Sequence, residues 1–315
     1  MNNEIVLIHN NYSWYLQFTI NNAKFYNNII TLLGNNLNNL QKLKVDKIID
    51  LSKYSDSEKI ILFKKLYFHL SPNSYDYELF CFLRWFYLFE YVKEYNLDYV
   101  LYIDSDYLLF DNLNNILNLT KINYAAFSIP KQSYSTYYWT ASGHVSIWTK
   151  ESLEDFCNFI IRAYSEISYI DKLKEKFNNS CSGGICDMTV FYLFYLEKES
   201  LITNLLNISN SYTHDHNINS SDNYLPKQFC TLFDIKFVFF YKGIPYFLDN
   251  RKNKIQAGGI HCQGTSKILI PLLYKGGKNL LFYKYYLYGL IHFIKYISIY
   301  VIKKILRPIK RILIK

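Results

Sequence analysis

The sequence predicts an α/β fold in which a mostly parallel sheet is flanked by helices and followed by a basic amphipathic helical tail. Short apolar segments of strand length alternate along the chain with longer segments of helical periodicity, as crossover connections require. Hydrophobic residues make up 50% of the 315 residues, which is enough to bury a sizeable core. The sequence contains no internal repeat.

The first half of the chain supplies strand and helix candidates in turn. Residues 4–9 and 29–33 are short apolar runs, and residues 12–28 between them have a helical pattern. Residues 79–95 form a long apolar-periodic helix that leads into the strand 99–103. Ligands of parallel sheets bind beyond the carboxyl ends of strands, so we expect a site just after residue 103.

The second half continues the alternation. Its expected elements are the strands 124–129, 144–148 and 233–241 and the helices 151–173 and 188–199. The stretch 207–223 is rich in Asn, Ser and His and is predicted to be a mobile loop. Within it, His214, Asp215 and His216 could form a metal cluster, but a solvated turn is the favoured interpretation.

Charge is distributed unevenly along the chain. All 26 acidic residues precede Arg251, whereas 14 of the 35 Lys and Arg residues lie from Arg251 onward. The first 250 residues therefore carry a net charge of −5, and the net +9 of the whole chain comes from its end. Such asymmetry indicates a basic segment for an anionic surface, either lipid or nucleic acid.

The final segment, from about residue 280, is apolar and basic together. Charged residues interrupt it too often for a spanning helix. One helical face carries Lys303, Arg307, Lys310 and Arg311, and another carries Ile297, Val301, Ile305, Ile309 and Ile312. This pattern favours an interfacial helix on anionic lipid, and a helix packed on the protein body is the alternative. We therefore expect a globular domain over 1–275 and a membrane-association segment over 276–315.

The start of the chain shows no basic region followed by a long apolar stretch, so we expect no secretory signal. The six cysteines form no paired CxxC pattern, and reduced thiols are expected. The predicted location is cytoplasmic with peripheral membrane association.

The most informative motif is Asp104-Ser105-Asp106, which follows the apolar strand 99–103. Carboxylates two residues apart at the end of a strand point to the same side of the sheet edge. Two such oxygen ligands suit Mg²⁺ or Mn²⁺, ions that usually accompany phosphates. The alternative is an ordinary turn, since Asp and Ser are common turn residues.

A second motif follows in Gln256–Lys267, where His261, Gly264 and Lys267 form the pattern His-x-x-Gly-x-x-Lys. An imidazole completes the coordination of Mn²⁺ more readily than that of Mg²⁺. A glycine permits close backbone approach, and a lysine supplies a point charge for phosphate. A histidine satisfied within the core is the alternative.

Together the two motifs resemble those of the GT-A glycosyltransferases of family 8 and their relatives. These enzymes use a nucleotide-sugar donor and a divalent metal, and they retain the anomeric configuration. The resemblance spans about residues 5–268 and implies a GT-A fold over 1–275. It implies a Mn²⁺ or Mg²⁺ site formed by Asp104, Asp106 and His261.

The resemblance also implies donor-binding and catalytic residues. The donor-binding positions are His9, Asn11, Arg84, Ser105, Ser142, Gly143, Gly264 and Lys267. Asp187 would stabilise an oxocarbenium-like centre or position the acceptor hydroxyl, and a helix N-cap is its alternative role. The chain departs from the family at His9, Ser142 and Met188, where Asp, Asn and Gln are usual.

The expected function is transfer of a hexose-type sugar from a nucleoside-diphosphate sugar, with UDP as the expected nucleotide, to a glycan or lipid-linked acceptor with retention. Expected partners include an anionic membrane surface but no nucleic acid. One alternative is a non-catalytic basic protein that binds lipid or nucleic acid. Another is a phosphatase of the haloacid dehalogenase type, although its Asp-x-Asp normally lies near the start of the domain.

Overall fold

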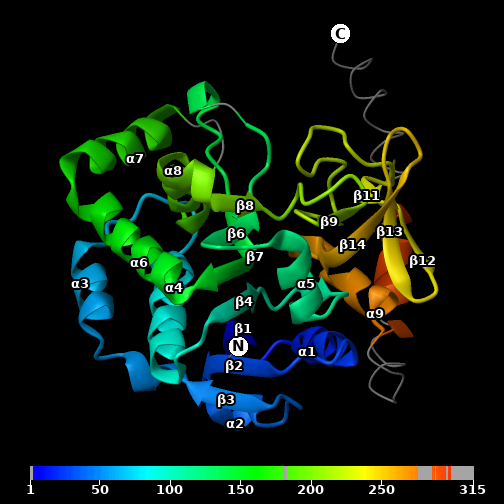
Figure 1. Ribbon diagram of the computed structural model, residues 1–315, viewed down its shortest axis with the longest axis horizontal. Coiled ribbons are helices and arrows are strands. Elements are labelled where there is room, and N and C mark those ends of the chain that lie inside the picture. Colours follow the sequence, from blue (N-terminus) through cyan, green and yellow to red (C-terminus); the bar gives the residue numbers. More distant parts are fainter. Residues whose placement is uncertain are drawn as a thin grey trace.

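The computed structural model describes residues 3–132, 134–179, 183–275, 286–287, 289–295 and 297–298. Its central sheet has seven strands in the order β3-β2-β1-β4-β7-β6-β8 (Figure 1). In chain order these are β1 Asn3–Asn10, β2 Ile30–Asn35, β3 Lys47–Asp50, β4 Tyr99–Ile103, β6 Ala125–Ser128, β7 Ser142–Thr149 and β8 Ile202–Asn204.

The central sheet is mostly parallel, as predicted. Strands β3, β2, β1 and β4 run parallel to one another, and β8 runs parallel to β6. Strand β7 is the exception, because it pairs antiparallel with both β4 and β6. The α/β class is therefore confirmed, with one reversed strand in the middle of the sheet.

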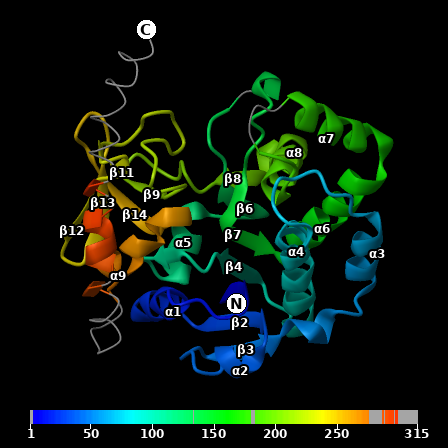
Figure 2. The same cartoon turned by 180° about the vertical axis from the view of Figure 1, so that it is seen from behind.

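Helices cover both faces of this sheet (Figures 1 and 2). The first face carries α3 Glu58–Leu66, α4 Tyr75–Tyr95, α6 Lys150–Ser165, α7 Ile167–Asn179 and α8 Asp187–Lys198. The second face carries α1 Leu16–Phe25, α2 Leu37–Leu40 and α5 Leu113–Thr120. Short 3₁₀ helices are η1 Leu51–Tyr54, η2 Tyr134–Thr136, η3 Glu199–Leu201 and η4 Gly264–Leu269.

The strand β1 shows why these runs are apolar throughout. Successive side chains point to opposite faces, so Ile5 and Leu7 pack with α1 and α5, whereas Val6 and Ile8 pack with α3 and α4. All four side chains are buried. A strand covered on both faces has no reason to alternate with polar residues.

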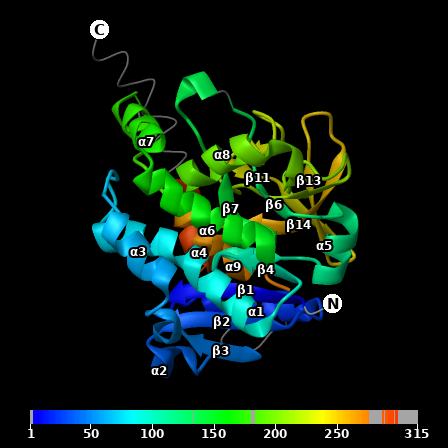
Figure 3. The ribbon, with the colours of Figure 1, turned by 60° about the vertical axis from the view of Figure 1, so that its left-hand side comes forward.

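A second sheet lies beside the first, on the side away from α3, α6 and α7 (Figures 1 and 3). Its strands are β5 Tyr107–Leu109, β9 Tyr212–His214, β12 Val238–Tyr241, β13 Ile244–Leu248 and β14 Lys254–His261. A hairpin of β10 Thr231–Leu232 and β11 Ile235–Lys236 and the helix α9 Ile270–Leu273 complete this part. Strand β14 pairs antiparallel with β5, with His261 opposite Tyr107.

Three predicted elements differ from the structure. The helix expected over 151–173 is two helices, α6 and α7, because Glu166 between them has an extended backbone (φ −86°, ψ 128°). The strand expected over 233–241 is β11 and β12, since Phe233 and Asp234 have positive φ and turn the chain after β10. The loop expected over 207–223 contains β9, whose three residues are all buried.

The predicted tail lies mostly outside the described residues. Among those of its residues that are described, 286–287, 289–295 and 297–298 are helical. Phe293 packs against the core of the second sheet, and an added Cβ at Gly289 would lie 2.7 Å from the carbonyl oxygen of Ile268. Across the described ranges, no helix combines the length and apolarity that crossing a membrane demands.

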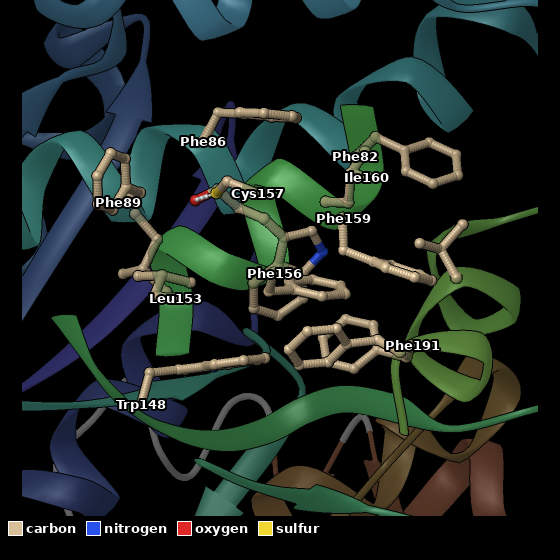
Figure 4. Close-up of a cluster of buried hydrophobic side chains, with 14 of the residues drawn as sticks. Phe82, Phe86, Phe89, Trp148, Leu153, Phe156, Cys157, Phe159, Ile160 and Phe191 are labelled. Carbon is tan, nitrogen blue, oxygen red and sulfur yellow. Dashed lines mark hydrogen bonds between the residues drawn. The ribbon is translucent and has the colours of Figure 1, made fainter. Parts of the chain in front are cut away.

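The largest core cluster joins the first face of the sheet to α4, α6 and α8, and aromatic rings dominate it (Figure 4). Phe156 is fully buried, and its ring centroid lies 4.3 Å from that of Phe191 and 5.2 Å from that of Trp148. The Trp85 ring centroid also lies 5.8 Å from that of Phe156 and 4.9 Å from that of Phe191.

The described cysteines are free thiols, namely Cys81, Cys157, Cys186, Cys230 and Cys262.

We predict that Phe156→Ala lowers the free energy of unfolding by about 3–5 kcal/mol, because it removes a fully buried ring and leaves a cavity. Phe177→Ala is the control, since its ring is 42% exposed and its loss should change stability by less than about 0.5 kcal/mol. Urea denaturation of both variants measures the difference. Equal losses would contradict the assignment of Phe156 to the core.

Candidate functional site

The two carboxylates of the Asp-x-Asp motif lie in the turn between β4 and β5. The turn is closed by backbone hydrogen bonds, in which Asp104 N–H donates to the His144 carbonyl at 2.8 Å and Tyr107 N–H to the Asp104 carbonyl at 3.0 Å. The Ser105 carbonyl accepts from the Thr19 hydroxyl at 2.6 Å. The motif therefore sits where the two sheets meet.

His261, at the end of β14, faces these carboxylates. Ligand atoms of Asp104, Asp106 and His261 all lie within 4.8 Å of one another, close enough to hold one metal ion. The His216 carbonyl lies 2.7 Å from His261 Nδ1 and can only accept, so Nδ1 carries a proton. This leaves Nε2, 3.4 Å from Asp106 Oδ1, on the side of the carboxylates.

Electrostatics favour an ionised Asp106 beside a cation. Burial alone would raise the pKa of Asp106, but the hydrogen bond and charge of His261 and the charge of Lys267 lower it to about 2. Burial would lower the pKa of His261, and Asp106 reverses this and raises it. Lys267 Nζ lies 3.2 Å from Asp106 Oδ2. Two carboxylates, one imidazole and an adjacent ammonium fit a divalent cation that binds phosphate.

Arg84 connects the first carboxylate to Asp187. Its guanidinium lies 2.8 Å from Asp104 Oδ1 and 2.6 Å from Asp187 Oδ2. Tyr102 also donates to Asp104, and Trp85 Nε1–H donates to Asp187 at 3.0 Å. Burial would lower the pKa of Arg84, but Tyr102 and the two carboxylates hold it well above its ordinary value.

Asp187 is the first residue of α8, and the N-cap position belongs to Cys186. The alternative role of Asp187 as the N-cap is therefore wrong. Its carboxylate is 6% exposed and is bonded to Arg84 and Trp85 instead.

A cleft of about 700 Å³ opens over this cluster. The predicted site residues that line it are Arg84, Asp104, Asp106, Ser142, Asp187, His261, Gly264 and Lys267. Gly264 has φ +61°, a conformation that favours glycine. Tyr77 and Tyr138 also line the cleft, and they are 60% and 57% exposed.

The other predicted donor-binding residues are not among those that line this cleft, although His9 lies close enough for the charge of Asp106 to act on it. Asn11 lines a separate hollow of about 720 Å³ with Tyr12 and Lys42. His9 bonds to the Ser13 hydroxyl at 2.8 Å. Gly143 is packed in the core, where an added Cβ would lie 2.4 Å from the Trp85 ring.

In the segment His214-Asp215-His216 the first two residues are buried and His216 is half-buried, which corrects the prediction of a solvated turn. His214 and Asp215 are 0% exposed, and the Asp215 carboxylate pairs with Lys236. These residues are not part of the candidate metal site, since among the described residues the group that could hold an ion consists of Asp104, Asp106 and His261.

Two residues of the site were missed by sequence reasoning. Lys236 is a single charge within the apolar run from Ile235 to Tyr241, and a charge in such a run signals a buried partner. Tyr102 offered no signal, because a tyrosine within an apolar strand is common. Its hydroxyl is nevertheless 2.7 Å from Asp104 Oδ1.

The sequence matches no family model and no curated protein. Among solved structures, mouse xyloside xylosyltransferase 1 in its apo form is similar over 65% of this chain and 85% of that chain, with 12% identity and a TM-score of 0.46. The galactosyltransferase LgtC, in complex with donor and acceptor sugar analogs, matches over 66% of this chain and 75% of that chain, with 14% identity and a TM-score of 0.41.

A cytidylyltransferase from Leptospira borgpetersenii serovar Hardjo-bovis also matches, over 56% of this chain and 74% of that chain, with 15% identity and a TM-score of 0.31. Similarity at this level leaves the chemistry to be inferred from the residues of the site.

We predict that His9 makes stability depend on pH. Burial, partly offset by Asp106, lowers its pKa from 6.5 to about 4. The unfolded chain therefore takes up this proton first, and stability falls as pH drops from about 6.5 to about 4, by on the order of 2 kcal/mol. His9→Gln should remove this part of the slope in urea denaturation across that range. Parallel slopes for the two proteins would contradict the prediction.

Proposed function

We propose that this chain is a metal-dependent glycosyltransferase that moves a hexose-type sugar from a nucleoside-diphosphate sugar, with UDP as the expected nucleotide, to a glycan or lipid-linked acceptor. The observation that carries the proposal is the convergence of Asp104, Asp106 and His261, with Lys267 beside them, in the wall of one cleft.

The residues fit the electrostatic demands of this reaction. Breaking the anomeric C–O bond leaves negative charge on the diphosphate. A Mn²⁺ or Mg²⁺ held by Asp104, Asp106 and His261 would act as a Lewis acid toward that leaving group. Lys267 adds a point charge at the same place, and its pKa is raised because Asp106 outweighs the effect of burial.

Asp187 supports a retaining mechanism. Its Oδ2 is held by Arg84 and Trp85, so the carboxylate is fixed and charge-balanced. A carboxylate in that state suits stabilisation of an oxocarbenium-like centre or orientation of the acceptor hydroxyl better than nucleophilic attack. A front-face displacement needs no protein nucleophile, and we propose it here.

The aromatic lining of the cleft suits a carbohydrate. Tyr77 and Tyr138 expose large parts of their surfaces there, and rings with a polar tip pack on apolar sugar faces while bonding to hydroxyls. Glu78 lines the same cleft, and its carboxylate accepts hydrogen bonds from Ser71 and Asn73.

We predict that Asp106→Asn lowers metal-dependent hydrolysis or transfer from a UDP-sugar by at least about 100-fold, because the leaving diphosphate loses its cation. Thermal shift with UDP-, GDP- and CMP-sugars, with and without Mn²⁺, identifies the donor before the kinetics are measured. In the variant, Mn²⁺ should no longer raise the melting temperature.

Asp56→Asn is the matched control, since Asp56 is exposed on the protein surface and its loss should leave both measurements unchanged. Full turnover in Asp106→Asn would exclude the proposal. If the protein released phosphate from simple phosphate monoesters and its melting temperature did not respond to nucleotide-sugars, the phosphatase alternative would be supported instead.

We also propose that the end of the chain places the enzyme on an anionic membrane in the cytoplasm. The described part of the tail leaves Leu287, Ile291 and Ile294 more than half exposed, at spacings that share one helical face. The sequence that follows is basic and lacks acids. An apolar face with basic neighbours suits the surface of anionic lipid.

We predict that replacing Lys303, Arg307, Lys310 and Arg311 together by Gln weakens binding to phosphatidylserine-containing vesicles at least about 100-fold, since each charge contributes about 1 kcal/mol near such a surface. Co-sedimentation measures this, and donor binding should not change. The control replaces four exposed body lysines: Lys64, Lys65, Lys93 and Lys174. Loss of donor binding with the vesicle binding would favour the non-catalytic alternative.

A further inference from the structure

We infer that the buried ion pair of Lys236 and Asp215 is a positioning device that holds the His261 imidazole at the metal centre and thereby sets a preference for Mn²⁺ over Mg²⁺. The inference rests on the metal site of the proposed function. Neither Lys236 nor Asp215 is a ligand, and both act through His261.

Asp215 and His216 contact both the backbone and the ring of His261. Asp215 Oδ2 accepts from the backbone N–H of His261 at 3.1 Å. The carbonyl of the next residue, His216, accepts from His261 Nδ1 at 2.7 Å. Position and ring orientation of His261 are therefore both fixed by the segment 215–216.

A third contact reaches His261 through His144. The Asp215 carbonyl accepts from His144 Nε2–H at 2.9 Å. The His144 ring stacks on that of His261, with centroids 4.1 Å apart and planes within 7° of parallel. Asp215 therefore also fixes the ring that supports the face of the imidazole.

Lys236 fixes Asp215 in turn. Both side chains are 0% exposed, and Lys236 Nζ lies 2.6 Å from Asp215 Oδ1. The ammonium also donates to the Asn217 carbonyl at 2.8 Å, so it anchors the same segment twice. Burial lowers the pKa of Lys236, but Asp215 opposes this shift.

A buried pair of this kind costs desolvation energy and is weak support for stability alone. Both charges here converge on a segment that makes two direct contacts to His261 and a third through His144. The cost is therefore matched by orientation of the imidazole. Residues behind a metal-bound histidine typically change metal affinity by about 10- to 100-fold.

Comparing the two ions distinguishes a misplaced His261 imidazole from a general loss of stability. Imidazole suits Mn²⁺, whereas Mg²⁺ prefers oxygen ligands, which Asp104 and Asp106 supply without help from Lys236. Misplacing the imidazole should therefore weaken Mn²⁺ much more than Mg²⁺. A variant that is merely destabilised should lose both ions equally.

The test is metal affinity of the purified full chain, without donor or acceptor, by electron paramagnetic resonance of free Mn²⁺ and by competition with Mg²⁺. Lys236→Met should weaken Mn²⁺ about 10-fold or more and Mg²⁺ less than about 3-fold. Because Lys236→Met leaves a buried carboxylate unpaired, the double variant Lys236→Met/Asp215→Asn removes both charges and should show the same change in the ratio.

Two further variants serve as the positive and the negative control. His261→Ala should give the largest loss of preference for Mn²⁺, because the imidazole is absent. Lys59→Met, which breaks the ion pair with Glu154, is the matched control and should leave both affinities unchanged. An unchanged Mn²⁺/Mg²⁺ ratio in the folded double variant would overturn the inference while leaving the proposed function intact. Failure of the unmodified chain to bind either ion would overturn both.

Discussion

The site depends on three antiparallel register pairs between β14 and β5. His261, Ile260 and Gly259 lie opposite Tyr107, Leu108 and Leu109. This pairing brings an imidazole to carboxylates about 155 residues earlier in the chain. Closing so long a loop is feasible because the entropic cost of closure grows only slowly with loop length. The pairing needs a glycine, because a Cβ at Gly259 would lie 2.1 Å from the Tyr107 hydroxyl. A slip by one residue would turn His261 to the other side of the sheet.

Charge balance is the second constraint, and it extends through the whole site. Asp104 and Asp187 share Arg84, Asp106 faces Lys267 and His261, and Asp215 has Lys236. Removing one partner of a buried pair leaves an uncompensated charge, which costs more than the pair itself contributes. Each acid of the cluster thus has a basic partner in a poorly solvated place. That is the condition a metal and diphosphate site has to meet.

Sequence patterns predicted the helices and strands whose formation depends mainly on residues within the element itself. The runs in β1, β4 and α4 are apolar because they are buried on the sheet, and the carboxylates follow a strand end, so both could be predicted from the sequence. The helix break at Glu166 and the burial of His214 could not be predicted from the sequence, because tertiary packing decides both. The closeness of His261 to Asp106 was a hypothesis that spacing cannot establish, and the β14–β5 pairing confirms it. The partner of Lys236 depends on the same long-range arrangement.

The aromatic core and the site are joined at Trp85. One side of its ring system packs in the core with Phe156 and Phe191, and its Nε1–H donates to Asp187. Gly143, just before His144, lies against the same ring, where a Cβ would come within 2.4 Å. Because a packed core transmits strain, any side chain at Gly143 would push on Trp85 and through it on Asp187. A position that does not line the cleft is thus constrained by a carboxylate that does.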